Sequence, residues 1–188
     1  MYLRDLIFTV IDFESTGTVK KFATEPWQIG LVQMKNGAFI NSFESLLYVG
    51  DRPFHPQAPG LHHQKRQALQ KAPQLNALWP TLKPWITEIP LVAHNIGTER
   101  KFLTRAAPMH SLGPWIDTLK LVRLVYPQFI SHSLEHVTHE LNLNVSAYCP
   151  NRTPHDALYD AYACALLLQH ILNLPEWKDL TLESYALL

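Results

Sequence analysis

The stretch that decides the fold is Leu6-Ile7-Phe8-Thr9-Val10-Ile11-Asp12-Phe13-Glu14-Ser15-Thr16-Gly17. Its first half is rich in β-branched and aromatic residues, which predicts a buried strand. Side chains alternate between the two faces of a strand, so Asp12 and Glu14 point to one face and Phe13 to the other. Ser15-Thr16-Gly17 then predicts a tight turn in which a ligand can approach backbone amides.

The two acids at the end of this apolar strand need an explanation. Asp12 and Glu14 repel each other, and both resist removal from water. A bound cation removes that penalty, and hard carboxylate oxygens suit Mg²⁺ or Mn²⁺. The alternative is a strand end with two solvated acids. So short a motif does not distinguish a metal site from a solvated strand end, and the sequence downstream is needed to do so.

Composition predicts an ordinary globular domain. The chain has 188 residues, and we expect one domain over 1–188 with a motif-bearing core at about 6–172 and a tail at 173–188. The formal net charge of +0 gives no overall basic field for nucleic acid, although a local patch can still serve a short single strand. Two cysteines form no disulfide framework, no apolar run has transmembrane length, and the N-terminus lacks a signal-peptide layout. We therefore expect a cytoplasmic protein without a membrane partner.

The chain in order predicts a mixed sheet. Strands are expected over Trp27–Met34 and Ala38–Val49, joined by the hairpin signal Asn36-Gly37, which makes the opening an antiparallel meander. Strand and helix signals alternate after that, which favours an α/β sheet with helices on its faces. Short strands are expected at 89–93 and 115–118, and helices at 98–105, 119–125, 133–141 and 157–172, with a proline-broken helical region over 62–86.

Two further segments that carry acids, one around Glu99 and one around Asp160, follow the first stretch in the order of three known sequence motifs. Taken with the first stretch, they resemble the DEDDh exonucleases, the DnaQ-like family that includes the proofreading 3′→5′ subunits of bacterial DNA polymerases. The resemblance runs from about Phe8 to Leu168. The first family motif, D-x-E-x-T-G, is matched by Asp12, Glu14, Thr16 and Gly17, and the second, H-N-x-x-F-D-x-x-F-L, is matched by His94, Asn95, Phe102 and Leu103. The third motif, H-x-A-x-x-D-A, is matched by His155, Ala157, Asp160 and Ala161. A linking motif, D-T-L-x-L-x-R, is matched by Asp117 to Arg123.

The resemblance implies a ribonuclease-H-like fold with a mixed five-stranded sheet, and a metal-dependent 3′→5′ exonuclease with two divalent cations, Mg²⁺ or Mn²⁺. By resemblance Asp12 bridges the metals, Glu14 and Asp160 complete the first site, and Glu99 supports the second. His155 matches the family's general base. Such chemistry agrees with the residues, because carboxylates hold a metal pair and a histidine accepts a proton near neutral pH.

The implied substrate is the 3′ end of single-stranded DNA or RNA, and the product is a nucleoside monophosphate. Ser15, Thr16 and Gly17, with His94 and Asn95 nearby, are expected to hold the terminal nucleotide. The family is associated with proofreading and DNA repair. The sequence does not identify a polymerase or repair partner.

Two residues of the second motif depart from the family pattern. Glu99 stands where the family has aspartate, and Thr98 stands where it has phenylalanine. Glu99 keeps the charge on a longer side chain, so we expect metal support; the alternative is a first-turn acid favoured by the helix dipole. Two other functions stay open: a nucleic-acid-binding module of the same fold with weakened or lost hydrolysis, and an interaction domain whose acids solvate a cleft.

The histidines have simpler interpretations as well. Thr153-Pro154-His155-Asp156 can be a helix start, with Thr153 as N-cap, Asp156 at the third helical position and His155 exposed. This is compatible with a catalytic His155, since a base at a loop–helix junction can reach the metals. A zinc site on His132, His136 and His139 needs more assumptions than a solvated helix face, which we favour.

Overall fold

A computed structural model describes residues 1–188 and contains one five-stranded mixed sheet in the order β3-β2-β1-β4-β5. β1 (Ile7–Ser15) pairs antiparallel with β2 (Pro26–Lys35), which pairs antiparallel with β3 (Ala38–Leu46). β4 (Leu91–Ala93) and β5 (Trp115–Asp117) then extend the sheet in parallel from β1. The predicted antiparallel opening followed by parallel strands is confirmed, with β3 ending at Leu46 instead of Val49.

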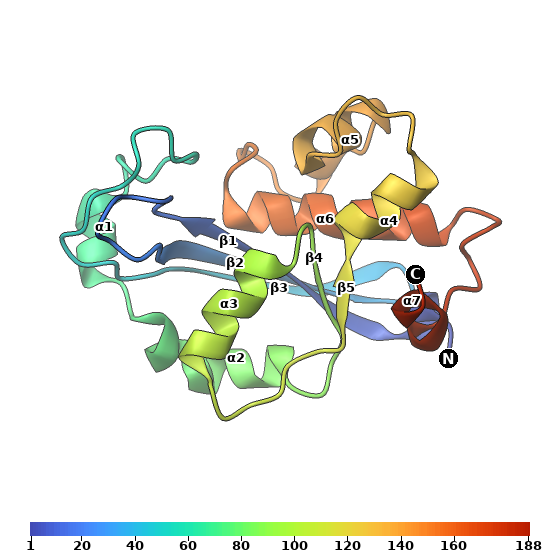
Figure 1. Ribbon diagram of the computed structural model, residues 1–188, viewed down its shortest axis with the longest axis horizontal. Helices are drawn as coiled ribbons and strands as arrows, with labels where there is room; N and C mark the ends of the chain where they lie inside the picture. The colour runs from blue at the N-terminus through green and yellow to red at the C-terminus, as the bar shows by residue number, and fades with distance from the viewer.

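Helices cover both faces of this sheet (Figure 1). α4 (Thr118–Val125), α5 (Leu134–Glu140) and α6 (Ala157–Leu172) lie on one face, and α2 (Trp79–Ile86) and α3 (Gly97–Ala106) lie on the other. α1 (Arg66–Lys71) lies at one end of the molecule and α7 (Leu182–Ala186) at the other, near the N-terminus. None of the helices has the length and apolar character needed to cross a membrane.

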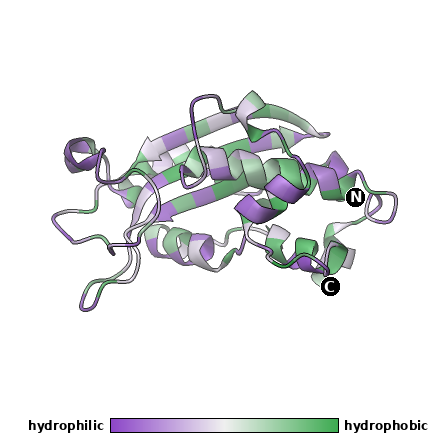
Figure 2. Cartoon of the chain, turned by 90° about the horizontal axis from the view of Figure 1, so that it is seen from above, coloured by the Kyte–Doolittle hydropathy of each residue, from purple (hydrophilic) through white to green (hydrophobic).

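Alternation along β1 divides the core in two. Phe8 and Val10 belong to a buried cluster with α6, whereas Ile11 and Phe13 belong to a second cluster with α2 and α3. Figure 2 shows the corresponding hydrophobic and hydrophilic bands along the strands. Because Asp12 follows Val10 by two residues, its side chain points to the α6 face. The sequence pattern of β1 therefore directs its acids toward α6.

Gly30 on β2 lets α6 approach the sheet closely. A Cβ atom at this position would lie 2.3 Å from the carbonyl oxygen of Ala157, the first residue of α6. Gly30 is also the cross-strand partner of Asp12. The absent side chain thus brings the first turn of α6 against the part of β1 that carries the acids.

The C-terminal segment is packed, although its sequence has no clear period. Thr181 caps α7, and the buried Tyr185 accepts a hydrogen bond from the backbone N–H of Asp117 through its hydroxyl at 2.7 Å. Leu3 N donates to Leu180 O at 2.7 Å. A helix this short shows no periodicity in the sequence, which is why 173–188 was expected only as a tail.

The proline-rich region splits as expected. α1 ends before Pro73, and a 3₁₀ turn, η2 (Leu75–Leu78), leads directly into α2. Pro80 lies in the first turn of α2, where backbone N–H groups make no hydrogen bond within the helix, so proline costs no such bond there. Pro84 lies inside that helix. Two further 3₁₀ turns are η1 (Leu3–Asp5) and η3 (Val145–Ala147).

Candidate active site

Three predicted site residues from two elements come together at one end of the sheet. A carboxylate oxygen of Glu14 on β1, one of Asp160 on α6, and a ring nitrogen of His155 all lie within 4.8 Å of one another. This is the one group of three or more His, Cys, Asp or Glu side chains with ligand atoms so close. The packing of α6 on β1 thus brings Glu14 and Asp160 together, although they lie 146 positions apart in the chain.

Asp12 adjoins this group without belonging to it. Burial raises the pKa of Asp12 well above its usual range, and the next largest causes are the charges of Asp160, Glu14 and Glu99. Each of these charges must be near Asp12 to have that effect. The four predicted carboxylates therefore face one region.

The other acids show the same electrostatic strain. Burial, followed by the charges of Asp160 and Asp156, raises the pKa of Glu14 to about 8. Burial also raises the pKa of Asp160 to about 6, against a hydrogen bond that its carboxylate accepts from the backbone N–H of His155 at 2.9 Å. A cluster of acids that resists ionisation in this way lacks positive charge.

Glu99 is not the solvated helix-start acid that the alternative interpretation requires. It lies in the first turn of α3, is only 5% exposed, and its Oε2 has no hydrogen-bond partner. Burial raises its pKa to about 7, with Asp117 adding to the effect. A buried carboxylate oxygen without a hydrogen-bond partner is rare in folded proteins, and the metal-supporting role of Glu99 stays a prediction.

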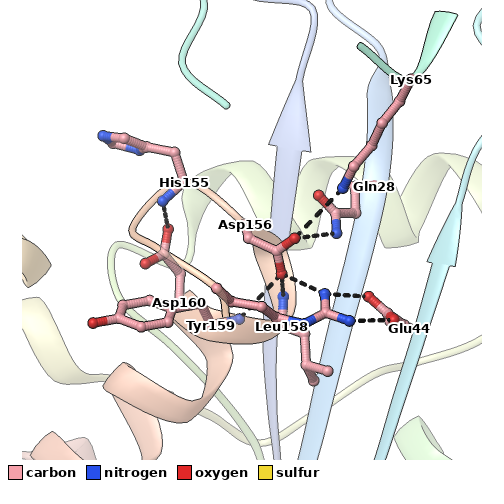
Figure 3. A network of polar contacts seen from close by, with 9 residues as sticks. Gln28, Glu44, Lys65, His155, Asp156, Leu158, Tyr159 and Asp160 are labelled. Carbon is pink, nitrogen blue, oxygen red and sulfur yellow. Dashed lines mark hydrogen bonds and ion pairs between the residues drawn. The ribbon is translucent and has the colours of Figure 1, made fainter. Parts of the chain in front are cut away.

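His155 lies immediately before α6 in a left-handed backbone conformation, with φ of 67°. Contrary to the helix-start prediction, Asp156 is itself the N-cap, accepting hydrogen bonds from Leu158 N and Tyr159 N, and Thr153 lies outside the helix. The positive φ of His155 turns the chain just before the cap, which the Thr-Pro signal did not reveal. Figure 3 shows this junction.

Asp156 is the centre of a polar network (Figure 3). Its Oδ2 accepts from Gln28 Nε2 at 3.0 Å and contacts Lys65 Nζ at 3.5 Å, while its Oδ1 accepts from Arg152 Nη1 at 2.8 Å. Arg152 also makes two hydrogen bonds to Glu44 on β3, each at 2.6 Å. The loop that carries His155 is therefore tied to strands β2 and β3.

Gln28 and Lys65 border the site although the sequence analysis did not assign them to it. Gln28 is 1% exposed, its Oε1 has no partner, and it lies directly opposite Glu14 across the β1–β2 ladder. The hairpin signal Asn36-Gly37 aligns β2 with β3 and not with β1, so it could not have placed Gln28 beside Glu14. No sequence signal pointed to Lys65, because its position depends on the course of an irregular loop.

After β1 the chain bends at Gly17, but the tight turn lies at Lys20 and Lys21 and not at the predicted Ser15-Thr16-Gly17. Thr16 N donates to Glu25 O at 2.9 Å, its hydroxyl accepts from Glu25 N at 3.1 Å, and its carbonyl accepts from His55 N at 2.8 Å. Gly17 has φ of 70°, and Ser15 Oγ accepts from Gly17 N at 3.4 Å. These bonds hold the segment beside the acids, while its contact with a nucleotide stays a prediction.

His94 and Asn95 follow β4 and are held by the protein itself. His94 Nε2 lies 2.8 Å from His132 O and its Nδ1 lies 3.0 Å from the Thr118 hydroxyl, so both ring nitrogens have partners. The Asn95 backbone, with φ of 71°, donates its N–H to Asp117 Oδ1 at 2.9 Å. The structure thus gives His94 a positioning role for this loop, and substrate contact by either residue stays a prediction.

His132, His136 and His139 do not all lie on one helix, contrary to the sequence-based expectation. His132 precedes α5, and its Nε2 lies 2.9 Å from the carbonyl of Tyr126. Only Glu14, His155 and Asp160 bring ligand atoms close together. His136 and His139 therefore lie on the helix without forming such a group.

The donor set fits hard divalent cations. Its carboxylate oxygens are the ligands that Mg²⁺ and Mn²⁺ prefer, and its one imidazole is better suited to accepting a proton. Burial first, and the neighbouring acids second, raise the pKa of Asp12 and of Glu14, and one buried oxygen of Glu99 has no partner. Both features are those expected of a site that binds positive charge.

Comparisons with known proteins agree with this geometry. The family model RNase_T, described as exonuclease, matches residues 9–168. The chain is similar to the DNA polymerase III PolC-type protein of Listeria welshimeri serovar 6b, with 29% identity over 88% of this chain and 11% of that protein. It thus spans only a small part of the length of such relatives.

Solved structures include similar folds over nearly the whole chain. Exonuclease X in complex with 5′ overhanging duplex DNA has 30% identity and a TM-score of 0.73, covering 95% of this chain and 97% of that one. The nuclease domain of 3′hExo, a DEDDh family member bound to rAMP, has 16% identity and a TM-score of 0.72, covering 92% and 94%. The second likeness shows the fold alone.

Proposed function

The chain belongs to the exonuclease family of the DEDDh, DnaQ-like type, and from that premise we propose that it is a metal-dependent 3′→5′ exonuclease acting on single-stranded DNA or RNA. The observation that carries the proposal is the convergence of Glu14, Asp160 and His155 within 4.8 Å. One histidine and several acids, drawn from distant parts of the chain, are the groups that phosphodiester hydrolysis requires.

The proposed metal ligands are Asp12, Glu14 and Asp160, with Glu99 supporting a second ion. When bound, Mg²⁺ or Mn²⁺ supplies positive charge that activates water and stabilises charge on the phosphoryl oxygens. In the protein, His155 accepts a proton from the attacking water at a ring nitrogen near the Glu14 and Asp160 oxygens. The network on Asp156 holds the loop that carries this base.

The proposed substrate is a strand end with a free 3′ hydroxyl, and the product is a nucleoside monophosphate. The segment Ser15, Thr16 and Gly17 would contact the terminal nucleotide, with His94 and Asn95 beside it. DNA is the first substrate to test, because Exonuclease X was solved with 5′ overhanging duplex DNA. A role in proofreading or repair, with a polymerase or repair partner, would follow from DNA specificity.

We further propose that residues 1–188 act as a single exonuclease domain. The packing of 173–188 against η1 and β5 supports this, since the segment is tied to both. A cytoplasmic location is proposed from the two cysteines, Cys149 and Cys164, which are both buried and unpaired.

The test is degradation of DNA and RNA oligonucleotides whose 3′ or 5′ ends are blocked, with Mn²⁺ or Mg²⁺ present. We expect monophosphate release from a free 3′ end and none when that end is blocked. Asp160→Asn should abolish release. Asp179→Asn, which changes an exposed acid outside the proposed site, should have no effect. Degradation from the 5′ end would contradict the proposal.

The rival function, binding without hydrolysis, is favoured by one observation, the glutamate at position 99. The same assay separates the two functions. Strand binding with Mn²⁺ and no product would support a module whose hydrolysis has been lost. Neither binding nor product would leave only an interaction domain.

A further inference from the structure

A polar cleft of about 600 Å³ lies beside His155. One wall is formed by Gly60, Leu61 and Lys65, just before α1, and the other by the loop of residues 150–156. Only one of its ten lining residues is hydrophobic. The cleft therefore suits a polar or charged ligand better than an apolar one.

Two cationic side chains line the cleft, and two carboxylates already neutralise one of them. Arg152 makes two hydrogen bonds of 2.6 Å to Glu44 and one of 2.8 Å to Asp156. Two carboxylates thus neutralise one guanidinium in short, well-formed contacts. Arg152 holds the loop in place and has little charge left for a ligand.

Lys65 is in a different state. Its one polar contact, to Asp156 Oδ2, is 3.5 Å long, at the limit of a hydrogen bond. Asp156 does not depend on this contact, because it already accepts from Gln28 at 3.0 Å and Arg152 at 2.8 Å and caps α6. The Lys65 ammonium can therefore change partner without leaving a buried charge unpaired, and two of its three donors are unused.

The Lys65 side chain is nevertheless held at the site. It is 29% exposed, and its ammonium lies 5.5 Å from the centre of the Trp27 ring. Its charge also reaches the catalytic acids: burial and the neighbouring acids raise the pKa of Glu14, and Lys65 opposes them. Lys65 is thus a positioned cation at the edge of an acidic centre.

We infer that Lys65 binds a phosphate group of the single-stranded nucleic acid in this cleft, on the wall opposite His155. The inference rests on the proposed function and adds a specific contact to it. The acids beside the cleft repel a phosphate backbone, so a strand that enters needs positive charge from the protein. A lysine ammonium binds phosphate as a point charge, and Lys65 is the cation in these walls that two carboxylates do not already neutralise.

The test compares Lys65→Met with Lys71→Met, a matched control that removes an exposed lysine from the other end of α1. Binding of a fluorescently labelled single-stranded DNA is measured by anisotropy over a range of salt concentrations, in an Asp12→Ala background that prevents cleavage. Lys65→Met should weaken binding several-fold and reduce the slope of log Kd against log salt by about 0.7, the value for one phosphate contact on a single strand. Lys71→Met should change neither, and Lys65→Arg should restore both.

Steady-state kinetics in the active protein gives a second readout. Lys65→Met should raise KM for the oligonucleotide by a larger factor than it lowers kcat, because a ground-state contact is lost. An unchanged salt slope in Lys65→Met would overturn the inference, and so would a fall in kcat and melting temperature alone, since that would make Lys65 only a structural partner of Asp156. Absence of hydrolysis in the parent protein would instead refute the proposed function.

Discussion

Single residues determine how the charges of the site are balanced. Glu14 and Glu99 are each 5% exposed and lie among other acids, so each has a raised pKa. Their types were readable from the sequence, and their burial was not. It follows from the packing of α3 and α6 around the end of β1.

The stability of the metal-free protein should decrease as pH rises. The usual pKa of Glu14 is 4.5 and its folded value is about 8, so between these values the folded state binds more protons than the unfolded state. Stability is then lost on going from about pH 5 to pH 8. Since one pKa unit corresponds to about 1.4 kcal/mol, Glu14→Gln should recover a few kcal/mol at pH 8. Urea unfolding at several pH values, with a chelator present, checks this; equal pH dependence in both proteins would contradict it.

His155→Ala should reduce turnover by about 10²- to 10⁴-fold, the usual contribution of one general base. Mn²⁺ affinity should change little if the carboxylates provide most of the binding. Single-turnover rates and a metal titration of the same variant measure the two effects. A variant as fast as the parent would leave His155 as a helix-junction residue without a catalytic role.

Glu99 supports a sharper prediction because its carboxylate is retained on a longer side chain. Glu99→Gln should lower the rate by weakening the second metal position, and Glu99→Asp should preserve or raise the rate with Mg²⁺. Mn²⁺ should outperform Mg²⁺ in the parent, because it tolerates distorted coordination. Hydrolysis rates of the parent, Glu99→Gln and Glu99→Asp, each measured with Mg²⁺ and with Mn²⁺, test this prediction. Full activity in Glu99→Gln would remove this residue from the site.

Among the elements, the approach of α6 to β2 controls whether the site assembles. Gly30 provides the space, since a Cβ there would lie 2.3 Å from Ala157 O. The first turn of α6 carries Asp160 and follows His155 directly. A small outward shift of this helix would separate both residues from the β1 acids.

Gly30→Ala should therefore destabilise the fold by about 1–3 kcal/mol, the range for overpacking, and reduce activity as well. Gly97→Ala is the matched control, because a Cβ at Gly97 meets nothing within 4 Å. Chemical denaturation and the exonuclease assay measure both variants. If Gly30→Ala keeps the parent's stability and activity, the close approach of α6 is not needed to form the site.

Across the chain, the sequence predicted what depends on local pattern. The order of strands, the helix over 157–172 and the face that carries Asp12 and Glu14 follow from periodicity and from the Asn36-Gly37 turn. The packing of 181–186, the cap at Asp156 and the position of Lys65 were not predicted. Each depends on contacts between segments far apart in the sequence, which no local pattern encodes. The nucleotide-binding residues remain predictions for the same reason.

We propose that the acids of β1, α3 and α6 form a metal-dependent hydrolytic centre. The most direct measurement is the rate of nucleotide release from a single strand as Mn²⁺ is titrated, for the parent and for Asp12→Ala. We expect no release with a chelator, saturating release with Mn²⁺, and no release in Asp12→Ala. The apo melting temperature of Asp12→Ala should equal or exceed the parent's, because carboxylate repulsion is relieved. Release that persists without divalent metal, or in Asp12→Ala, would contradict the claim.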